Sequence, residues 1–449
     1  MTAPLAAFIE AACVPLDSGH VTGVLERAEA ILAAHPEVAS ANIHAAAILG
    51  DDAAVRRFLE LDPANATVKG GPRGWDALTH LCFSRYLRLD HARSAGFVRA
   101  ATTLLDAGAS ANTGWYEMNH RPGPEWESAL YGAAGVAHHA DLTRLLLQRG
   151  ADPNDGETPY HAPETHDNGA VHALLDSGKL SDDSLATMLL RKADWHDYDG
   201  SKLLLEHGAD PNRMTRWHYT ALHQAVRRDN ALENIQLLLD HGADATLANR
   251  ADGRSAVALA ARRGRGDVLA LLERRGVAVE PAGVDRLIAA CARNDVAGVR
   301  SLVRGEPSLA GQLLAEGGRL LAQFAGNGNA DGVRHLLDLG VDVGALYEEG
   351  DGYWDVAPGS TALHVAAWRA QHATVKLLLE RGATVNGPDG RGRTPLALAV
   401  RACVDSYWTE RRSPESVEAL LAAGASLDGV TVPSGYAAVD ALLLRHRAL

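Results

Sequence analysis

One spacing constrains this chain more than any other feature. Gly208, Gly242 and Gly276 stand 34 residues apart, and a leucine-rich segment precedes each of them. Self-similarity at a period of about 20 to 50 residues is typical of stacked repeat proteins, in which each unit buries its apolar faces only against its neighbours. We therefore expect the 449 residues to form a solenoid of repeated helix pairs rather than a set of separate globular domains.

The segment around Gly242 shows how one repeat is built. The helix predicted over residues 237–239 is apolar on more than one side, as a helix packed between neighbours must be. Gly242 follows at the position where a helix ends in the left-handed backbone conformation, which glycine adopts without a steric penalty. Asp244 begins a run of turn formers, and Thr220 stands where the N-cap of a helix belongs. Each repeat is therefore predicted to contain two short helices and an extended finger.

These residues resemble the ankyrin repeat family. The family pattern of Thr-Pro-Leu-His, a short helix, a leucine-rich helix, Gly-Ala-Asp and a finger is matched by Thr220, Leu222, His223, residues 237–239 and residues 242–244. The resemblance implies an all-α, ankyrin-type helical solenoid, in which we count about 10–12 helix-pair repeats with protruding fingers and an irregular middle. It also implies that His223, and His364 in a second match, are structural residues whose rings join backbone groups of adjacent fingers.

The repeat pattern changes in regularity along the chain, and these changes divide the chain into three predicted segments. Residues 1–62 are expected to form an N-terminal helical cap with the first repeat. Residues 63–280 are expected to form a run of repeats, and residues 281–449 to form further repeats with a C-terminal cap. Since no stretch is left over for a separate catalytic domain, any activity must be carried by the repeats themselves.

The repeat within residues 158–200 is the most irregular. Pro163 stands where its first helix should continue, and a proline there removes a hydrogen bond and clashes with the preceding turn. We therefore expect that helix to be stunted. The first helix of the preceding repeat, over residues 128–134, is expected to be an ordinary one, and a long finger separates it from Gly108.

Charge and cysteine content narrow the classes of partner. Forty-three Lys and Arg against 56 Asp and Glu give a net charge of −13. A general nucleic-acid or anionic-membrane binder needs a concentrated positive surface, so we expect neither as a partner. Cys13, Cys82, Cys291 and Cys403 are far apart and form no CxxC, which predicts reduced thiols in the core of a cytoplasmic protein without a metal site or cofactor. The high content of Ala, Arg, Asp and Gly favours a bacterial source.

Aromatic residues that gather before first helices predict a binding surface. In the ankyrin repeat family the fingers and first helices line the concave surface where partners bind, and Trp, Tyr and Arg most often supply interface energy. We therefore favour a protein that recognises a protein or peptide partner on its concave face and is not an enzyme. The opposing interpretation is that the long fingers fold back and bury these rings. The residues assigned to binding are Trp115, Tyr116, Glu117, Arg121, Tyr160, Trp195, Arg213, Trp217, Tyr353 and Trp354.

A polar edge at residues 158–230 supports an alternative. Polar residues in the turns between helices are predicted to align from one repeat to the next, about 10 Å apart. Such a row would suit a small-molecule site or an enzyme of hydrolase or lyase type, with a divalent metal as a further alternative. Pro163 is expected to prevent His161 and Glu164 from lying side by side as metal ligands. Solvated turns, which collect polar residues anyway, are the plainer explanation. The residues of this alternative are His161, His166, Asp167, His196, Asp197 and Arg228.

Overall fold

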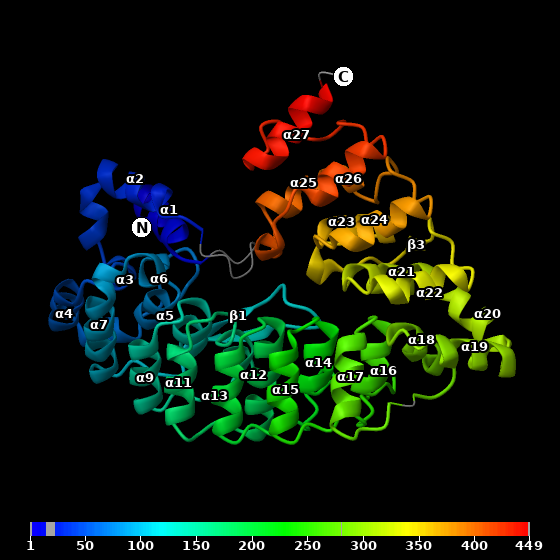
Figure 1. The fold of residues 1–449 in the computed structure, drawn as a ribbon. Helices are drawn as coiled ribbons and strands as arrows, with labels where there is room; N and C mark the ends of the chain where they lie inside the picture. Colours follow the sequence, from blue (N-terminus) through cyan, green and yellow to red (C-terminus); the bar gives the residue numbers. More distant parts are fainter. Residues whose placement is uncertain (1, 15–22, 280, 448–449) are drawn as a thin grey trace. The chain divides into compact units, whose positions relative to one another are not determined.

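The computed structural model of the chain describes residues 2–14, 23–279 and 281–447. Almost all regular structure in these residues is helical, and short helices follow one another in pairs (Figure 1). The strands in the same residues form two small two-stranded sheets. The prediction of an all-α fold of helix pairs is therefore confirmed. Within the described residues, no helix is both long enough and apolar enough to cross a membrane.

The chain forms two compact units, which interleave in sequence. Unit 1 consists of Met1–Arg228 with Gln236–Ala243, and unit 2 consists of Asp229–Ile235 with Asp244–Leu449. Helix α15 (Leu232–Asp240) therefore contributes its first residues to unit 2 and its last residues to unit 1. The three segments predicted from the sequence, residues 1–62, 63–280 and 281–449, were defined by the regularity of the repeats. That division stays a prediction.

Unit 1 is a stack of short helices in which α9, α11 and α13 lie in a row as second helices of successive repeats (Figure 1). A π-helix, η4 (Gly132–Val136), continues α8, and three 3₁₀ helices, η1 (Pro36–Ser40), η2 (Pro63–Ala66) and η3 (His91–Arg93), join other elements. The α-helices are α1 (Ala3–Ala12), α2 (Glu26–Ala34), α3 (Ile43–Ile48), α4 (Asp52–Leu61), α5 (Ala77–Cys82), α6 (Arg85–Leu89), α7 (Ser94–Asp106), α8 (Ala129–Tyr131), α9 (Ala140–Gln148), α10 (Glu157–His161), α11 (Gly169–Asp176), α12 (Asp182–Asp194), α13 (Tyr198–Glu206) and α14 (Ala221–Arg227).

Unit 2 has the same construction, with first helices α21, α23 and α25 packed in sequence. Two 3₁₀ helices, η5 (Gly352–Trp354) and η6 (Thr409–Arg411), lie in its connections. Its α-helices are α16 (Ala256–Arg262), α17 (Gly266–Arg274), α18 (Asp285–Ala292), α19 (Val296–Gly305), α20 (Ser308–Ala315), α21 (Gly317–Gly326), α22 (Ala330–Asp338), α23 (Ala362–Trp368), α24 (His372–Glu380), α25 (Pro395–Val404), α26 (Glu415–Ala422) and α27 (Ala437–Arg447).

The ends of the helices follow the chemistry that the sequence predicts. At the start of α14, Thr220 Oγ1 lies 2.7 Å from Nδ1 of His223 in a capping box. In a later repeat, His364 Nε2 lies 2.9 Å from the carbonyl oxygen of Gly387 in the next finger. Gly242 has a φ of 87°, the left-handed conformation expected after a second helix. These histidines therefore occupy the structural positions that the family resemblance implies.

The turn between the two helices of a repeat also takes a left-handed residue. The φ angle is 52° at His138, 53° at His196 and 54° at Asp229. Asp and His are among the few non-glycine residues that are enriched in this conformation. The presence of His196 and Asp229 in the predicted polar edge of residues 158–230 is therefore explained by the backbone conformation alone.

In unit 2, Asp229 is the centre of a buried ion-pair cluster. Its carboxylate accepts hydrogen bonds from Arg263 Nε at 2.6 Å, from Arg369 at 2.8 Å and from Asn327 Nδ2 at 3.0 Å. The three donors follow α16, α23 and α21, so four inter-helix turns meet at one carboxylate. Burial alone would raise the pKa of Asp229, but the guanidinium groups of Arg263 and Arg369 hold it well below its usual value.

The structure agrees with the prediction for the irregular repeat and contradicts the prediction for the repeat before it. Helix α10 is stunted to five residues, as predicted from Pro163. The preceding helix is not ordinary, however, because α8 has three residues and continues as the π-helix. A Cβ atom at Gly135 in this π-helix would meet the Cβ atom of His161 at 2.8 Å, so a glycine is needed for α10 to approach. π-helices are frequent at functional sites.

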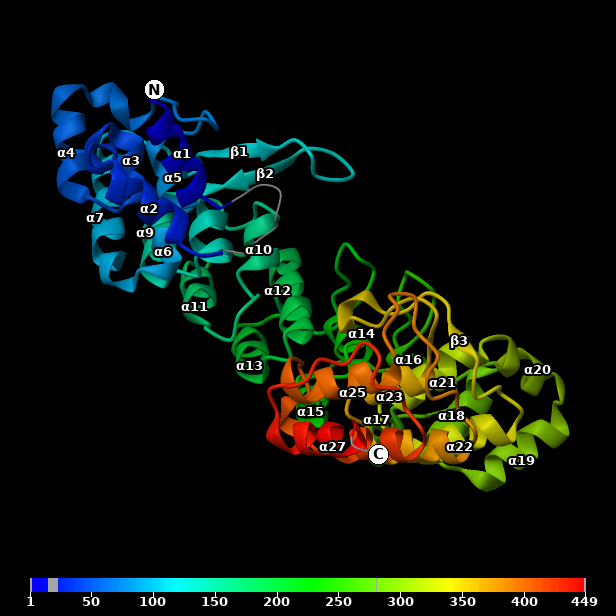
Figure 2. The same ribbon diagram turned by 90° about the horizontal axis from the view of Figure 1, so that it is seen from above.

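Both long fingers are β-hairpins. In unit 1, β1 (Gly114–Glu117) pairs antiparallel with β2 (Glu125–Ser128), and the hairpin extends away from the helices (Figure 2). In unit 2, β3 (Leu346–Tyr347) pairs with β4 (Ser360–Thr361). The four cysteines are free and buried, as the sequence predicts.

Candidate functional site

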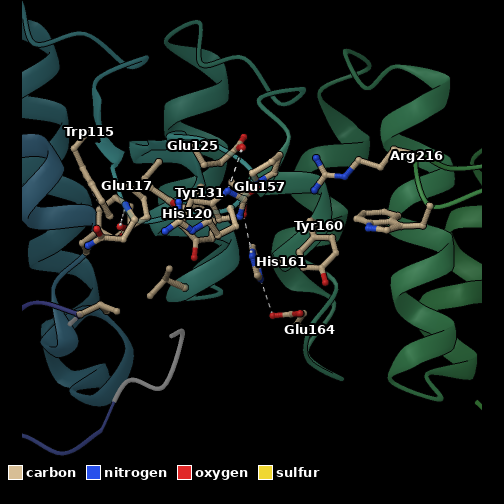
Figure 3. A pocket seen from close by; sticks show the side chains of 18 residues that line it. Trp115, Glu117, His120, Glu125, Tyr131, Glu157, Tyr160, His161, Glu164 and Arg216 are labelled. Atoms are coloured by element: carbon tan, nitrogen blue, oxygen red, sulfur yellow. Dashed lines mark hydrogen bonds and ion pairs between the residues drawn. The ribbon is translucent and has the colours of Figure 1, made fainter. Parts of the chain in front are cut away.

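A pocket of about 810 Å³ lies in unit 1 between the β1–β2 hairpin and the irregular helix α10 (Figure 3). Side chains from the hairpin, α8, the π-helix η4, α10 with the turn after it and the finger before α14 line it, together with Val14 and Phe83. Five of the lining residues are glutamates. The site is therefore concave and strongly acidic, and aromatic rings form much of its wall.

The register of the hairpin turns one face of its strands into the pocket. Trp115 stands directly opposite Glu127, and Glu117 stands opposite Glu125. Since successive residues of a strand point to opposite faces, these four side chains share a single face. Tyr116, on the other face, is 59% exposed and packs on Trp126 with ring centroids 4.8 Å apart. Two glutamates directly opposite each other destabilise a strand pair, so this arrangement costs the hairpin stability.

Glu127 is the most unusual group in the pocket. Its residue is only 7% exposed, and its carboxyl has no hydrogen-bond partner among the described residues. Burial raises the pKa of Glu127 to about 8, and the nearby carboxylate of Glu157 adds to the effect. Opposite it, the indole Nε1 of Trp115 is also buried without a partner in the described part of the chain. A buried polar atom without a partner is costly, so Trp115 Nε1 lacks an acceptor that a ligand can supply, and the Glu127 carboxyl lines the same pocket.

His161 lies between two carboxylates at the base of the pocket. Its Nε2 is 3.0 Å from Glu157 and its Nδ1 is 2.8 Å from Glu164 (Figure 3). Burial alone would lower the pKa of His161, but these hydrogen bonds raise it above the usual value. Burial alone would raise the pKa of both glutamates, but the same contacts lower it.

The contact between His161 and Glu164 corrects an expectation from the sequence. Pro163 was expected to keep the two side chains apart, yet they are hydrogen-bonded. The physical reason is local: Pro163 lacks only its own amide proton, and the amide of Glu164 donates to the carbonyl oxygen of His161 at 2.9 Å. One further turn therefore follows α10 and brings residues 161 and 164 to the same side.

An ion-pair network supports the pocket from behind. Arg191 on α12 pairs with both Glu164 and Asp194, and its guanidinium lies 4.0 Å from the ring centroid of Tyr160. Asp194 in turn accepts a hydrogen bond from Arg228 at 2.7 Å. The network fixes Glu164 and Tyr160, because each is held by the same planar guanidinium.

Aromatic side chains form two walls of the pocket. Trp115 stacks on Trp75 with ring centroids 5.2 Å apart and meets Phe83 edge-on at 6.0 Å. On the opposite side, the rings of Tyr160 and Trp217 lie 5.2 Å apart, and the exposed Arg216 lies over Trp217 at 4.5 Å. The cation–π contacts at this second wall are thus made by the protein's own arginines.

The structure brings five of the residues assigned to binding into the pocket. Trp115, Glu117, Arg121, Tyr160 and Trp217 line it. The other five lie elsewhere: Tyr116 is on the outer face of the hairpin, Trp195 is half-exposed after α12, Arg213 pairs with Asp182 and Asp183, and Tyr353 and Trp354 belong to unit 2. Trp354 is buried against Trp408, so the opposing interpretation, that a finger buries its rings, describes that position.

The residues of the alternative site do not converge on this pocket. His161 lines it, and Arg228 lies at the far end of the network through Asp194. Asp197 caps α13 and pairs with the buried Lys192 at 2.7 Å. His166 lies beside Trp195 at 6.1 Å between ring centroids, His196 occupies a left-handed turn, and Asp167 accepts a hydrogen bond from the amide of Gly169. Around Asp197 and Asp167, therefore, polar side chains serve helix ends.

Sequence reasoning missed Glu125, Glu127, Glu157 and Tyr131 as site residues. The signal was present in the order Glu125-Trp126-Glu127-Ser128, whose alternation is that of a strand with one acidic face. Within the described residues, no group of three or more His, Cys, Asp or Glu side chains is arranged to bind a metal ion.

Comparison with known proteins places the repeats in a family. A model described as "Ankyrin repeats (3 copies)" matches residues 189–281, 286–389 and 321–430, which together cover more than half of the chain. Serine/threonine-protein kinase 12 of Arabidopsis thaliana is 39% identical over 85 residues, 19% of this chain and 17% of that protein. Rabankyrin-5 is 36% identical over 84 residues in Mus musculus and 40% over 68 residues in Homo sapiens, which is 18% and 14% of this chain.

The aligned segments span less than a fifth of each of these relatives, so their similarity concerns the repeats and not the whole proteins. Most of the pocket precedes the residues that the family model matches, because only Arg216 and Trp217 fall within them. The glycine spacing, the capping histidines, the helix pairs and the match over more than half the chain agree, and the chain belongs to the ankyrin repeat family.

Proposed function

We propose that this protein binds a protein or peptide partner, and that the pocket of unit 1 is the centre of the binding surface. The observation that carries the proposal is the convergence of Trp115, Tyr160 and Trp217 from three different elements on one concave site. Trp and Tyr in well-packed, concave settings are the residues that most often dominate binding energy. Ankyrin repeats typically act as protein-binding modules, which supports the same function.

The hairpin gives the surface a second part. Next to the pocket it presents Tyr116 and Met118, which are 59% and 69% exposed. Apolar side chains that stand exposed beside a polar pocket are typical of interaction sites. A partner segment that enters the pocket would therefore also contact the outer face of the hairpin.

An enzyme or small-molecule site on the polar edge finds less support. Asp197 and Asp167 serve helix ends, and His196 satisfies a backbone requirement. The cytoplasmic location and bacterial origin remain predictions, and the buried free cysteines support the first of them.

Panning of a random peptide library on the immobilised protein tests the proposed function. We expect it to select peptides that Trp217→Ala binds at least about 30-fold more weakly, because a hot-spot side chain is worth about 2 kcal/mol or more. Trp195→Ala is the matched control, since it removes a half-exposed Trp of unit 1 outside the pocket. Equal binding by Trp217→Ala, or loss on Trp195→Ala alone, would contradict the pocket as the site.

A further inference from the structure

The pocket lacks a positive charge at one defined place. Its five glutamates are Glu117, Glu125, Glu127, Glu157 and Glu164. Two of these, Glu157 and Glu164, share His161, and Glu164 also pairs with Arg191. Among the described residues, the cationic partner of Glu125 is His120, at 3.8 Å. The carboxyls of the pocket that lack a close cationic partner among the described residues are therefore those on the hairpin face, Glu117, Glu125 and Glu127.

Glu127 points to a ligand by its burial as well as by its charge. It is more than nine-tenths buried, lines the pocket and has no hydrogen-bond partner among the described residues. A carboxyl in this position must either keep its proton or meet a cation, because an isolated buried charge is too costly. In the free chain Glu127 keeps its proton, and a cationic ligand would allow it to ionise and form an ion pair.

The surroundings of Glu127 favour an organic cation. Trp115 stands opposite it on the hairpin, and Phe83, which contacts the rings of both Trp115 and Tyr131, lines the pocket with them. Aromatic faces attract organic cations, and the attraction is strongest when the cation is desolvated. The arginines of the pocket do not reach this place: Arg216 lies over Trp217 on the opposite wall, and Arg121 is exposed.

We infer that the pocket receives an organic cation, which the partner carries as the side chain of a lysine or arginine and which pairs with Glu127 against Trp115. The inference rests on the proposed function and specifies the chemistry of its partner. The unpartnered indole Nε1 of Trp115 adds a donor that a backbone carbonyl of the same partner segment would satisfy.

Pairing with a cation must release a proton. The groups that act on Glu127 are Glu117 and Glu125 on the hairpin and Glu157 and His161 on α10, and of these only His161 favours the ionised carboxyl. With a pKa of about 8, Glu127 is about nine-tenths protonated at pH 7. Binding should therefore release up to about 0.9 proton at pH 7. As the pH is raised toward 8, the Kd should fall by up to about tenfold per pH unit.

The test uses titration calorimetry of the full chain at pH 7 in two buffers with different heats of ionisation. The first probes are the panned peptides that bind Trp217→Ala more weakly than the native chain, called pocket-dependent peptides. The second are the same peptides with lysine replaced by norleucine or arginine by citrulline. The third are the free cations butylammonium and propylguanidinium. We expect the neutral replacement to weaken binding at least about tenfold, and Glu127→Gln to weaken it similarly and abolish proton release. Glu206→Gln, which removes an exposed charge on α13, should bind as the native chain does.

Each outcome separates the inference from the proposed function. Pocket-dependent peptides that bind equally well after neutral replacement, or equally well to Glu127→Gln, would overturn the inference and leave the proposed function standing. Free cations that bind the native chain but not Glu127→Gln, with no peptide selected, would support the cation site and overturn the peptide as its source. Absence of binding by peptides and free cations alike would overturn both.

Discussion

A carboxyl group that is buried beside other carboxyls holds its proton more tightly in the folded chain than in the unfolded chain. Glu127 is such a group, because its pKa of about 8 lies above the ordinary value of 4.5. The folded state therefore binds more protons than the unfolded state between these two values. The stabilising contribution is fully present below pH 4.5 and is lost as the pH rises through about 8.

Glu127→Gln should remove this pH dependence. Glutamine imitates the protonated carboxyl, so the variant and the native chain should have nearly equal unfolding free energies at pH 4.5. At pH 9 the variant should be more stable by about 3 to 5 kcal/mol, because it has no charge to bury. Urea denaturation at the two pH values measures the difference. A variant that is less stable than the native chain at pH 9 would show that Glu127 is ionised at little cost in the fold.

At the scale of the element, the sequence predicted regular repeats better than irregular ones. The glycine after a second helix, the capping Thr220 and the stunted helix at Pro163 each depend on local chemistry, which a sequence shows directly. The alternation of residues 125–128 indicates a strand with one acidic face, but the strand that pairs with it is set by a register that the repeat pattern does not contain. The contact of His161 with Glu164 depends on one turn beyond a proline, which the repeat pattern does not contain either.

The π-helix is an element whose packing allows a sharp prediction. Gly135→Ala should destabilise unit 1 by about 1 to 3 kcal/mol, since the added Cβ would meet His161 Cβ and the Tyr131 ring, both at 2.8 Å. Gly311→Ala is the matched control, because Gly311 lies in helix α20 with open space around it. This variant should be more stable than the native chain by about 0.5 to 1 kcal/mol. Thermal unfolding of the two variants checks the prediction, and equal stability would show that α10 yields to the methyl group.

At the scale of the whole molecule, a carboxylate in unit 2 connects elements far apart in sequence. Asp229→Asn should cost about 3 to 5 kcal/mol, because Arg263 and the buried Arg369 would lose the charge that compensates them. Asp331→Asn removes an exposed partner of Arg334 and should change stability by less than about 1 kcal/mol. Denaturant unfolding monitored by tryptophan fluorescence measures both. A loss for Asp229→Asn no larger than that of the control would show that the cluster contributes no net stability.

The division of α15 between the two units has a practical consequence for anyone who wishes to dissect the protein. Residues Asp229–Ile235 belong to unit 2, whereas Gln236–Ala243 belong to unit 1. A single cut before Asp229 deprives unit 1 of its last helical segment, and a single cut after Ala243 deprives unit 2 of the Asp229 carboxylate. No scission at one peptide bond therefore yields both halves complete, and genes that encode them separately would need overlapping ends.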